Sequence, residues 1–459
     1  MSSPTRLPRG LLVAFCLPSL VLGVMHGPEG MIQSVYAKHA ALSLTALAAA
    51  MLATKMFDAI TYPLIGTLSD RAYARTGSRR GWVIGGSLLS VVGVWFLLRP
   101  PQEVTVVYFG IWMAVTYVGW KVIEIPLQAW SYTLSADYAQ RARVQAWRAF
   151  AQIAGPFLFF AMPYIAMQIG YSDSSELDFR NLGFAAVVCA VALPLATAIM
   201  VARVPSESTG PPPAPRRFSA KEFVRAVRDN PPLLRLCAAF LPFNLLVGVL
   251  NGVAYLYIDA YLGLGKQFAA IAAAALLATL VGLPFWSALA ARYERHRVWA
   301  GCMAAAGIAF AGFAAASPGP LALPLCFVCY PIIFFCVSSS VIVYTMSADI
   351  VDYGKLNLGE DHGGLYGALF FFLQKSLMGV SAAAGLALIG MFGFDATAAV
   401  QSASGVIGIK LTGAILPAIG MIGAAAIIWN YPLTRARMAE VQAALAKRDS
   451  AIRPDQFSQ

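Results

Sequence analysis

Apolar residues recur along this chain in runs of about 20, separated by short polar segments, and a run of that length can cross a bilayer as one α-helix. The pattern predicts an all-α membrane protein rather than a soluble one. We expect twelve membrane-spanning helices, at residues 11–37, 43–69, 81–99, 104–133, 145–169, 181–203, 232–259, 267–291, 298–316, 320–348, 363–392 and 406–431.

A polar segment at 204–231 divides the twelve predicted spans into two sets of six. It contains three consecutive prolines followed by five basic residues, a composition typical of a connector that rests on a membrane surface. We therefore expect a six-helix half at 1–203, a cytoplasmic connector at 204–231, a second six-helix half at 232–434 and a cytoplasmic tail at 435–459.

The two predicted halves resemble each other weakly in sequence. Pro63 and Arg71 recur as Pro284 and Arg292, each pair at the same end of the second helix of its half and each followed by a basic turn. This repeat predicts two pseudo-symmetric halves, an arrangement in which the substrate site of a transporter lies between the halves near the bilayer midplane.

The composition agrees with a membrane protein, because 59% of the residues are hydrophobic and 12% are charged. The net charge of +11 arises from an unequal distribution: most of the 33 Lys and Arg lie on one side of the predicted spans. By the positive-inside rule that side is cytoplasmic, so we expect both termini in the cytoplasm and the protein in the inner membrane. The basic excess thus reflects topology and not a nucleic-acid partner.

Cysteine and histidine are too scattered for an obvious metal or redox site. The seven cysteines occur within apolar runs, and Cys326 and Cys329, although spaced like a redox motif, lie inside a predicted span. The four histidines are isolated in the sequence. We expect no metal, no cofactor and no enzyme activity.

Ionisable residues inside predicted spans are the main functional signal, because an ionised side chain at membrane depth costs a few kcal/mol or more. Lys55 and Asp58 lie three residues apart on one helix and are expected to neutralise each other, with Tyr62 one turn further on. Lys121 and Glu124 repeat the spacing two spans later. Structural ion pairs are the alternative, but the occurrence on several spans favours a cation or proton coupling site at Lys55, Asp58, Tyr62, Lys121 and Glu124.

Other polar residues at membrane depth are candidates for binding the transported solute. Pro28 is expected to loosen the backbone of the first span, since it removes one helical hydrogen bond. The substrate-side candidates are Arg148, Gln128, Lys375, Gln374, His26 and Glu29.

Charged residues at the cytoplasmic ends of the spans are candidates for a gate. Asp349 and Asp352 follow the tenth span and are expected to pair with Arg141 or Arg143 of the other half, in contacts that break as the halves rock. Asp70 and Arg71, in the loop after the second span, are expected to join this gate. A solvated loop is the alternative.

Residues 57–86, 122–148 and 348–379 resemble the glycoside–pentoside–hexuronide:cation symporter family of major facilitator transporters, typified by melibiose permease. The two-half symmetry extends the likeness over nearly the whole chain, as a divergent branch. The resemblance implies the major facilitator fold and alternating access. It also places Asp58, Glu124, Arg148 and Lys375 at family positions for the sugar and cation sites, with Lys55 where the family has Arg.

Two departures from the family concern the cation site. Tyr62 stands where the family has a second aspartate, and Lys121 replaces a hydroxyl that resembles a Na⁺ ligand. Because a hard cation needs several oxygen ligands, a permanently charged amine would both fill and repel that site. We hypothesise that Lys121 stands in for the metal ion, so that transport is proton-coupled or uncoupled rather than driven by Na⁺.

Further departures concern the sugar contacts. The family's helix I aspartate aligns near Leu22, and its two stacking tryptophans align with Gln128 and near Ser340. These losses argue against a galactoside, and neither Trp120 nor Trp130 clearly replaces a lost ring.

The sequence therefore predicts a monomeric secondary transporter that moves a small polar solute, such as a glycoside, a uronate or a related organic solute, by alternating access. Its expected partners are that solute, the lipid bilayer and, as a candidate coupling ion, the proton. A lysolipid or lipid-linked solute transporter of the same fold is the main alternative. A membrane receptor without transport and a membrane-embedded enzyme are less favoured.

Overall fold

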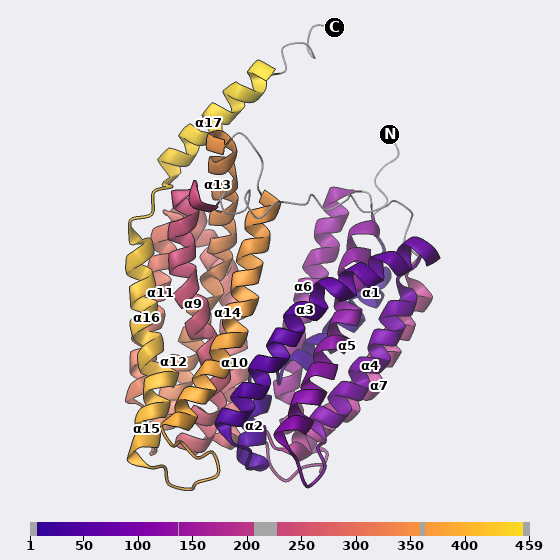
Figure 1. The fold of residues 1–459 in the computed structure, drawn as a ribbon, viewed down its shortest axis with the longest axis vertical. Helices are drawn as coiled ribbons and strands as arrows, with labels where there is room; N and C mark the ends of the chain where they lie inside the picture. The colour runs from indigo at the N-terminus through magenta and orange to yellow at the C-terminus, as the bar shows by residue number, and fades with distance from the viewer. Residues whose placement is uncertain (1–6, 136, 206–226, 359–362, 453–459) are drawn as a thin grey trace. The chain divides into compact units, whose positions relative to one another are not determined.

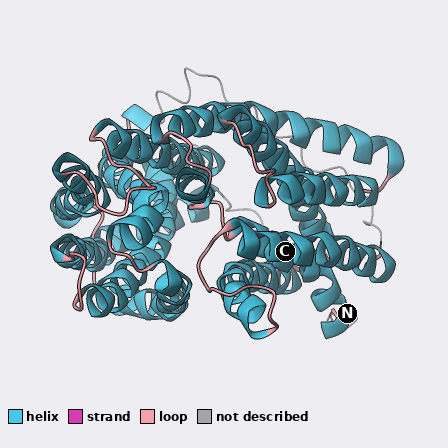
Figure 2. Ribbon diagram, turned by 90° about the horizontal axis from the view of Figure 1, so that it is seen from below, coloured by secondary structure: helices cyan, strands magenta, loops and turns pink. Residues whose placement is uncertain are grey.

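The computed structural model describes residues 7–135, 137–205, 227–358 and 363–452 (Figure 1). The ordered elements in these ranges are helices joined by loops, with no strand among them (Figure 2). Twelve helical segments in these ranges are long and apolar enough to cross a membrane. The predicted fold class and number of spans are confirmed.

The helices of the first 203 residues follow the predicted spans closely. They are α1 (Arg9–His26), α2 (Ile32–His39), α3 (Leu44–Thr76), α4 (Arg80–Leu98), α5 (Val106–Thr133), α6 (Tyr138–Gln168) and α7 (Phe179–Arg203).

The remaining helices include short π and 3-10 segments that continue longer α-helices. They are α9 (Pro231–Leu256) with η1 (Tyr257–Tyr261), α10 (Gly265–Arg292), α11 (Arg295–Ala315), α12 (Ala322–Val337) with η2 (Ser338–Ser340), α13 (Val341–Leu358), α14 (Gly363–Met391), α15 (Ala403–Lys410) with η3 (Leu411–Ile415), α16 (Leu416–Trp429) and α17 (Arg435–Ile452).

The chain forms two compact units. The first comprises residues up to 214 together with 251–273 and 382–408, and the second comprises 215–250, 274–381 and 409–459. The predicted connector at 204–231 lies mostly outside the described residues, so the division of the chain at this segment stays a prediction.

The first predicted span, at 11–37, is broken into two helices. α1 ends at His26, residues 27–31 form a turn, and α2 begins at Ile32. Pro28 lies in this turn, where its missing N–H removes no helical hydrogen bond. The expected loosening at Pro28 is therefore a complete interruption of the helix.

A C-terminal helix, α17, was missed because its residues are too polar for a membrane span. The segment was predicted as a tail, but it is rich in Ala, Arg and Lys, which favour helix. Met438 and Val441 are buried, and the guanidinium of Arg448 donates to the Lys355 carbonyl of α13 at 3.0 Å. The helix is thus held against the second unit by both apolar and polar contacts.

Close packing of α1 on α6 depends on two glycines. A Cβ atom at Gly155 would lie 2.4 Å from the carbonyl carbon of Gly23, which is closer than real Cβ contacts allow. Membrane helices associate largely through such small residues, because lipid tails remove the hydrophobic drive that operates in water. The backbones of α1 and α6 therefore touch at this point.

We expect Gly155→Val to separate α1 from α6 and to destabilise the protein by about 1–3 kcal/mol, the usual cost of overpacking. The melting temperature of the purified protein in detergent should fall by several degrees. Gly85→Val on α4 is the matched control, because no atom lies within 4 Å of a Cβ at Gly85. Equal melting temperatures for the two variants would show that the contact does not limit stability.

Candidate functional site

An ion pair between a buried lysine and a half-buried aspartate joins α3 and α5. The ammonium of Lys121 contacts the carboxylate and the backbone carbonyl of Asp58, and it lies 3.4 Å from the Thr61 hydroxyl oxygen. Lys121 is 8% exposed, and the ring of Tyr62 lies 5.4 Å from its nitrogen. Three oxygen atoms of α3 thus surround one cationic nitrogen from α5.

A second charged cluster joins the break after α1 to α3. One carboxylate oxygen of Glu29 lies 3.0 Å from the Lys55 ammonium, and the other lies 3.0 Å from Nδ1 of His26. The Lys55 ammonium also lies over the ring of Tyr117, 4.2 Å from its centroid. The side chains of this cluster are each about a quarter to a third exposed.

These contacts correct two predicted pairings. Lys55 was expected to neutralise Asp58 on the same helix, but each has its partner on another element. Lys121 was placed beside Glu124, yet its ammonium contacts α3 instead. The i, i+3 spacing is compatible with a contact along one helix, but tertiary partners one helix away offer better geometry.

A polar row on α5 and α6 lies next to the ion pair. The buried guanidinium of Arg148 hydrogen-bonds the side-chain oxygen of Gln128, whose amide nitrogen donates to the Tyr132 hydroxyl. The amide of Gln152 donates to Glu124 at 3.4 Å. The half-exposed or exposed members of this row are Glu124, Gln128, Tyr132 and Gln152.

Arg148 is too buried to be a simple solute contact. Its side chain is 2% exposed, and besides Gln128 it reaches the hydroxyl oxygens of Ser19 and Ser131 at 3.5 Å. The structure brings Arg148 and Gln128, two of the substrate-side candidates, into contact, and their role in binding a solute stays a prediction. In this geometry Arg148 orients Gln128, which carries the more exposed polar group.

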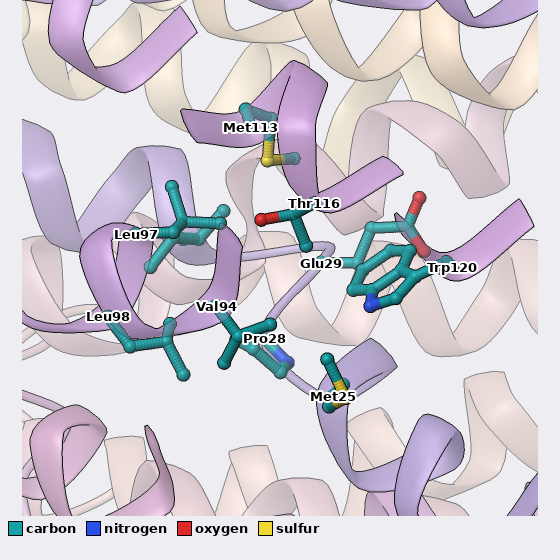
Figure 3. Close-up of a pocket in the computed structure, with 10 residues that line it drawn as sticks. Met25, Pro28, Glu29, Val94, Leu97, Leu98, Met113, Thr116 and Trp120 are labelled. Carbon is teal, nitrogen blue, oxygen red and sulfur yellow. The ribbon is translucent and has the colours of Figure 1, made fainter. Parts of the chain in front are cut away.

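Trp120 and Trp130 of α5 offer no free face to a solute. Trp130 is 1% exposed and packs edge-on against Phe15, and Trp120 is 4% exposed and packs against the His26 ring with centroids 3.9 Å apart. Trp120 also lines a small pocket with Glu29 and Thr116 (Figure 3). The burial and packing of Trp120 and Trp130 disfavour either ring as a stacking platform for a sugar.

The remaining substrate candidates lie in the second unit. Gln374 accepts a hydrogen bond from the Tyr344 hydroxyl at 2.6 Å, and the exposed Lys375 has its ammonium 6.0 Å from the ring centre of Phe371. Their participation in one site with Gln128 stays a prediction.

The predicted gate residues have local partners. Asp349 pairs with Arg295, whereas the guanidinium of Arg141 donates to the Ser135 carbonyl at 2.8 Å. Asp70 pairs with Arg79 at 3.0 Å. Arg71 is exposed and Asp352 is half-buried. The predicted pairing of Asp349 and Asp352 with Arg141 or Arg143 stays a prediction.

A three-way ion cluster was missed by the sequence analysis. The Lys38 ammonium at the end of α2 lies 2.6 Å from a Glu176 oxygen and 2.7 Å from a carboxylate oxygen of Asp259 in η1. Asp259 is buried, and His39 lies 3.7 Å from Glu176. Charges at the ends of predicted spans look like interfacial residues, so nothing in their sequence positions indicated that they meet.

Among the described residues, no group of three or more His, Cys, Asp or Glu side chains has the arrangement of a metal site. The charged side chains of the clusters around Lys121, Lys55 and Lys38 form ion pairs with one another or hydrogen bonds with polar groups. Ionisable groups at the depth of membrane-spanning helices are costly there, which makes these residues candidates for a functional role.

A sequence profile of the MFS/sugar transport protein family matches residues 15–435. The chain belongs to this family. It is a multi-pass membrane protein and a secondary transporter of the major facilitator fold, which confirms the predicted resemblance and the predicted class of function. Its relatives are transporters rather than enzymes.

Two relatives and one solved structure illustrate the likeness. The inner membrane symporter YicJ of Escherichia coli K12 is 26% identical over 367 residues, which cover 77% of this chain and 76% of that protein. The putative glycoside/cation symporter YagG of the same organism is 22% identical over 426 residues, which cover 89% of this chain and 88% of that protein. The crystal structure of the nucleoside transporter NupG superposes with a TM-score of 0.64 at 12% identity over 92% of this chain and 98% of that one.

We expect Lys121→Met to lower the stability by about 3 kcal/mol, because it leaves the Asp58 carboxylate without its buried cation. The double variant Asp58→Asn with Lys121→Met should recover most of the melting temperature in detergent. Arg180→Met is the control, since Arg180 and Asp173 form an exposed pair that is worth little. A double variant that is as unstable as Lys121→Met would contradict the pairing.

Acid should weaken the cluster at Lys38 through His39. Burial, together with the neighbouring Lys38, lowers the pKa of His39, so the neutral form contributes stability above about pH 6.5, and this contribution is lost as the pH falls through the lowered pKa. His39→Gln should therefore reduce the drop in melting temperature between about pH 7 and about pH 5. An unchanged drop would show that His39 does not sense this acidification.

Proposed function

We propose that this protein is a Na⁺-independent secondary transporter of a small polar solute of the glycoside or uronate class. The single observation that carries the proposal is the position of the Lys121 ammonium among oxygen atoms of α3. A sodium ion would need such oxygens as ligands, and the amine already occupies the place among them. The pairing with Asp58 supports the hypothesis that Lys121 stands in for the metal ion.

The polar row on α5 and α6 supports a solute with several hydroxyl groups. Gln128 and Gln152 each carry a donor and an acceptor, Tyr132 adds a hydroxyl and Glu124 adds a carboxylate that accepts from hydroxyl groups. These groups are exposed or half-exposed, so a solute can reach them. The name of YagG, a putative glycoside/cation symporter, agrees with this class.

Alternating access requires contacts that close one end of the site at a time. We assign the cluster of Lys38, Glu176 and Asp259 to the end opposite the termini, and the pair of Asp349 and Arg295 to the cytoplasmic gate region. The positive-inside distribution supports cytoplasmic termini and an inner-membrane location.

The test is a thermal-shift panel of glycosides, uronates and lysolipids, each run with Na⁺ or with choline. A ligand that binds the folded state raises the melting temperature. At a concentration of 100 times its Kd, the ligand adds about 2.7 kcal/mol to the free energy of unfolding. We expect a polar solute to give the largest shift, with equal values in Na⁺ and choline. Uptake of that solute into proteoliposomes should likewise be unaffected by a Na⁺ gradient.

The outcomes that contradict the proposal are distinct. A shift that depends on Na⁺ would overturn the role given to Lys121, and a lysolipid as the largest shift would overturn the solute class. Asp173→Asn is a control for both measurements, because its carboxylate is exposed and pairs with an exposed arginine.

A further inference from the structure

The break between α1 and α2 places an acidic side chain among three neighbouring elements. Glu29 lies in the turn at residues 27–31, where the chain has left α1 and has not yet entered α2. Interrupted membrane helices are common places for ion sites in transporters, because both their backbone and their side chains can reach into the protein interior. The position of Glu29 therefore follows from the interruption.

The groups that face Glu29 come from every element around it. His26 of α1 and Lys55 of α3 each bind one carboxylate oxygen at 3.0 Å, and Tyr117 of α5 interacts with both Lys55 and Glu29. From α9, the uncharged Asn251 approaches the backbone of neighbouring Gly30. The carboxylate thus has one fixed cation, one imidazole and one phenol as its titratable neighbours.

A change of charge costs less at Glu29 than at Asp58. Protonating Asp58 would leave Lys121, which is 8% exposed, as a buried cation without its counter-ion. Protonating the Glu29 cluster leaves Lys55 over the Tyr117 ring, and the Lys55 side chain is 23% exposed. The second cluster can accept a proton while its cation keeps a favourable contact.

The pocket beside Glu29 is small: about 10 Å³ is accessible to the centre of a water molecule, which is room for about one water. The buried indole N–H of Trp120 has no hydrogen-bond partner, and Figure 3 shows its nitrogen on the edge of the ring that faces the pocket. The Thr116 hydroxyl, which donates to the Trp112 carbonyl, can still accept a hydrogen bond. The site is suited to hold one water next to the cluster.

We propose that Glu29 and His26 form the proton-binding site of this transporter, separate from the pair of Asp58 and Lys121. The inference rests on the proposed Na⁺-independent transport and names its coupling ion. One proton taken up from the aqueous solvent forms an O–H bond on the Glu29 carboxyl group, with the His26 ring nitrogen 3.0 Å away as its hydrogen-bond partner, and the cluster with Lys55 changes from net neutral to a net charge of +1. Asp58 keeps its contact with Lys121 and takes no part in this step.

The first experiment needs no solute. Infrared difference spectra of the purified protein between about pH 8 and about pH 6, a range in which exposed carboxylates stay ionised, record a buried carboxyl group that becomes protonated. We expect a protonated-carboxyl band in the unmodified protein, its loss in Glu29→Gln, and its retention in Asp58→Asn and in Glu103→Gln, whose carboxylate lies on an exposed loop. A band that persists in Glu29→Gln, or that disappears in Asp58→Asn, would overturn the assignment.

A second pair of variants covers the case in which Glu29→Gln does not fold. Glu29→Asp keeps a carboxyl group and should move the midpoint of the band, and His26→Gln should also move it by removing the imidazole partner. Midpoints that match the unmodified protein in both variants would contradict the proposal.

Transport gives the functional readout with the solute found by thermal shift. Glu29→Gln should lower accumulation driven by a proton gradient by about tenfold or more, while exchange of labelled for unlabelled solute at equal pH stays within about twofold. Accumulation that equals that of Glu103→Gln would overturn the inference. Failure of every solute to be transported would instead overturn the proposed function, because the infrared result stands without a solute.

Discussion

The low dielectric of the bilayer interior is the constraint on which this structure depends. A charge placed there without a partner destabilises the protein by several kcal/mol, so the ionisable residues of α1, α3 and α5 must meet across helices. Lys121 and Asp58 tie α5 to α3, and Glu29 and Lys55 tie the break after α1 to α3. The same contacts that hold the first unit together are therefore those available for coupling.

Two similar pairs of charges have different surroundings. The cation of one pair, Lys121, contacts oxygen atoms of α3, whereas the cation of the other, Lys55, lies over the ring of Tyr117. The row of Glu124, Gln128, Tyr132 and Gln152 offers amide, hydroxyl and carboxylate groups, which under the proposed function replace the water around a hydroxylated solute. Under the proposed function, the ion pairs balance charge, and the polar row on α5 and α6 binds the solute.

Hydrophobic periodicity was sufficient to predict the twelve spans and most of their ends, because run length alone decides whether a helix can cross a bilayer. It was also sufficient to single out Asp58, Glu124 and Arg148 as unusual. It could not assign partners: Lys55 has an acid three residues away in sequence, yet it pairs with one 26 residues away. α17 was missed for the opposite reason, since its contacts to α13 depend on tertiary packing that leaves little trace in hydropathy.

The interruption of the first span has a mechanical consequence. A continuous helix transmits a rotation along its whole length, whereas α1 and α2 are two separate helices joined by a five-residue turn. α1 is packed backbone to backbone on α6 at Gly155, while α2 ends at Lys38, which is held by Glu176 and Asp259. Any tilt of α1 together with α6 that leaves α2 in place would be taken up by the turn that carries Glu29.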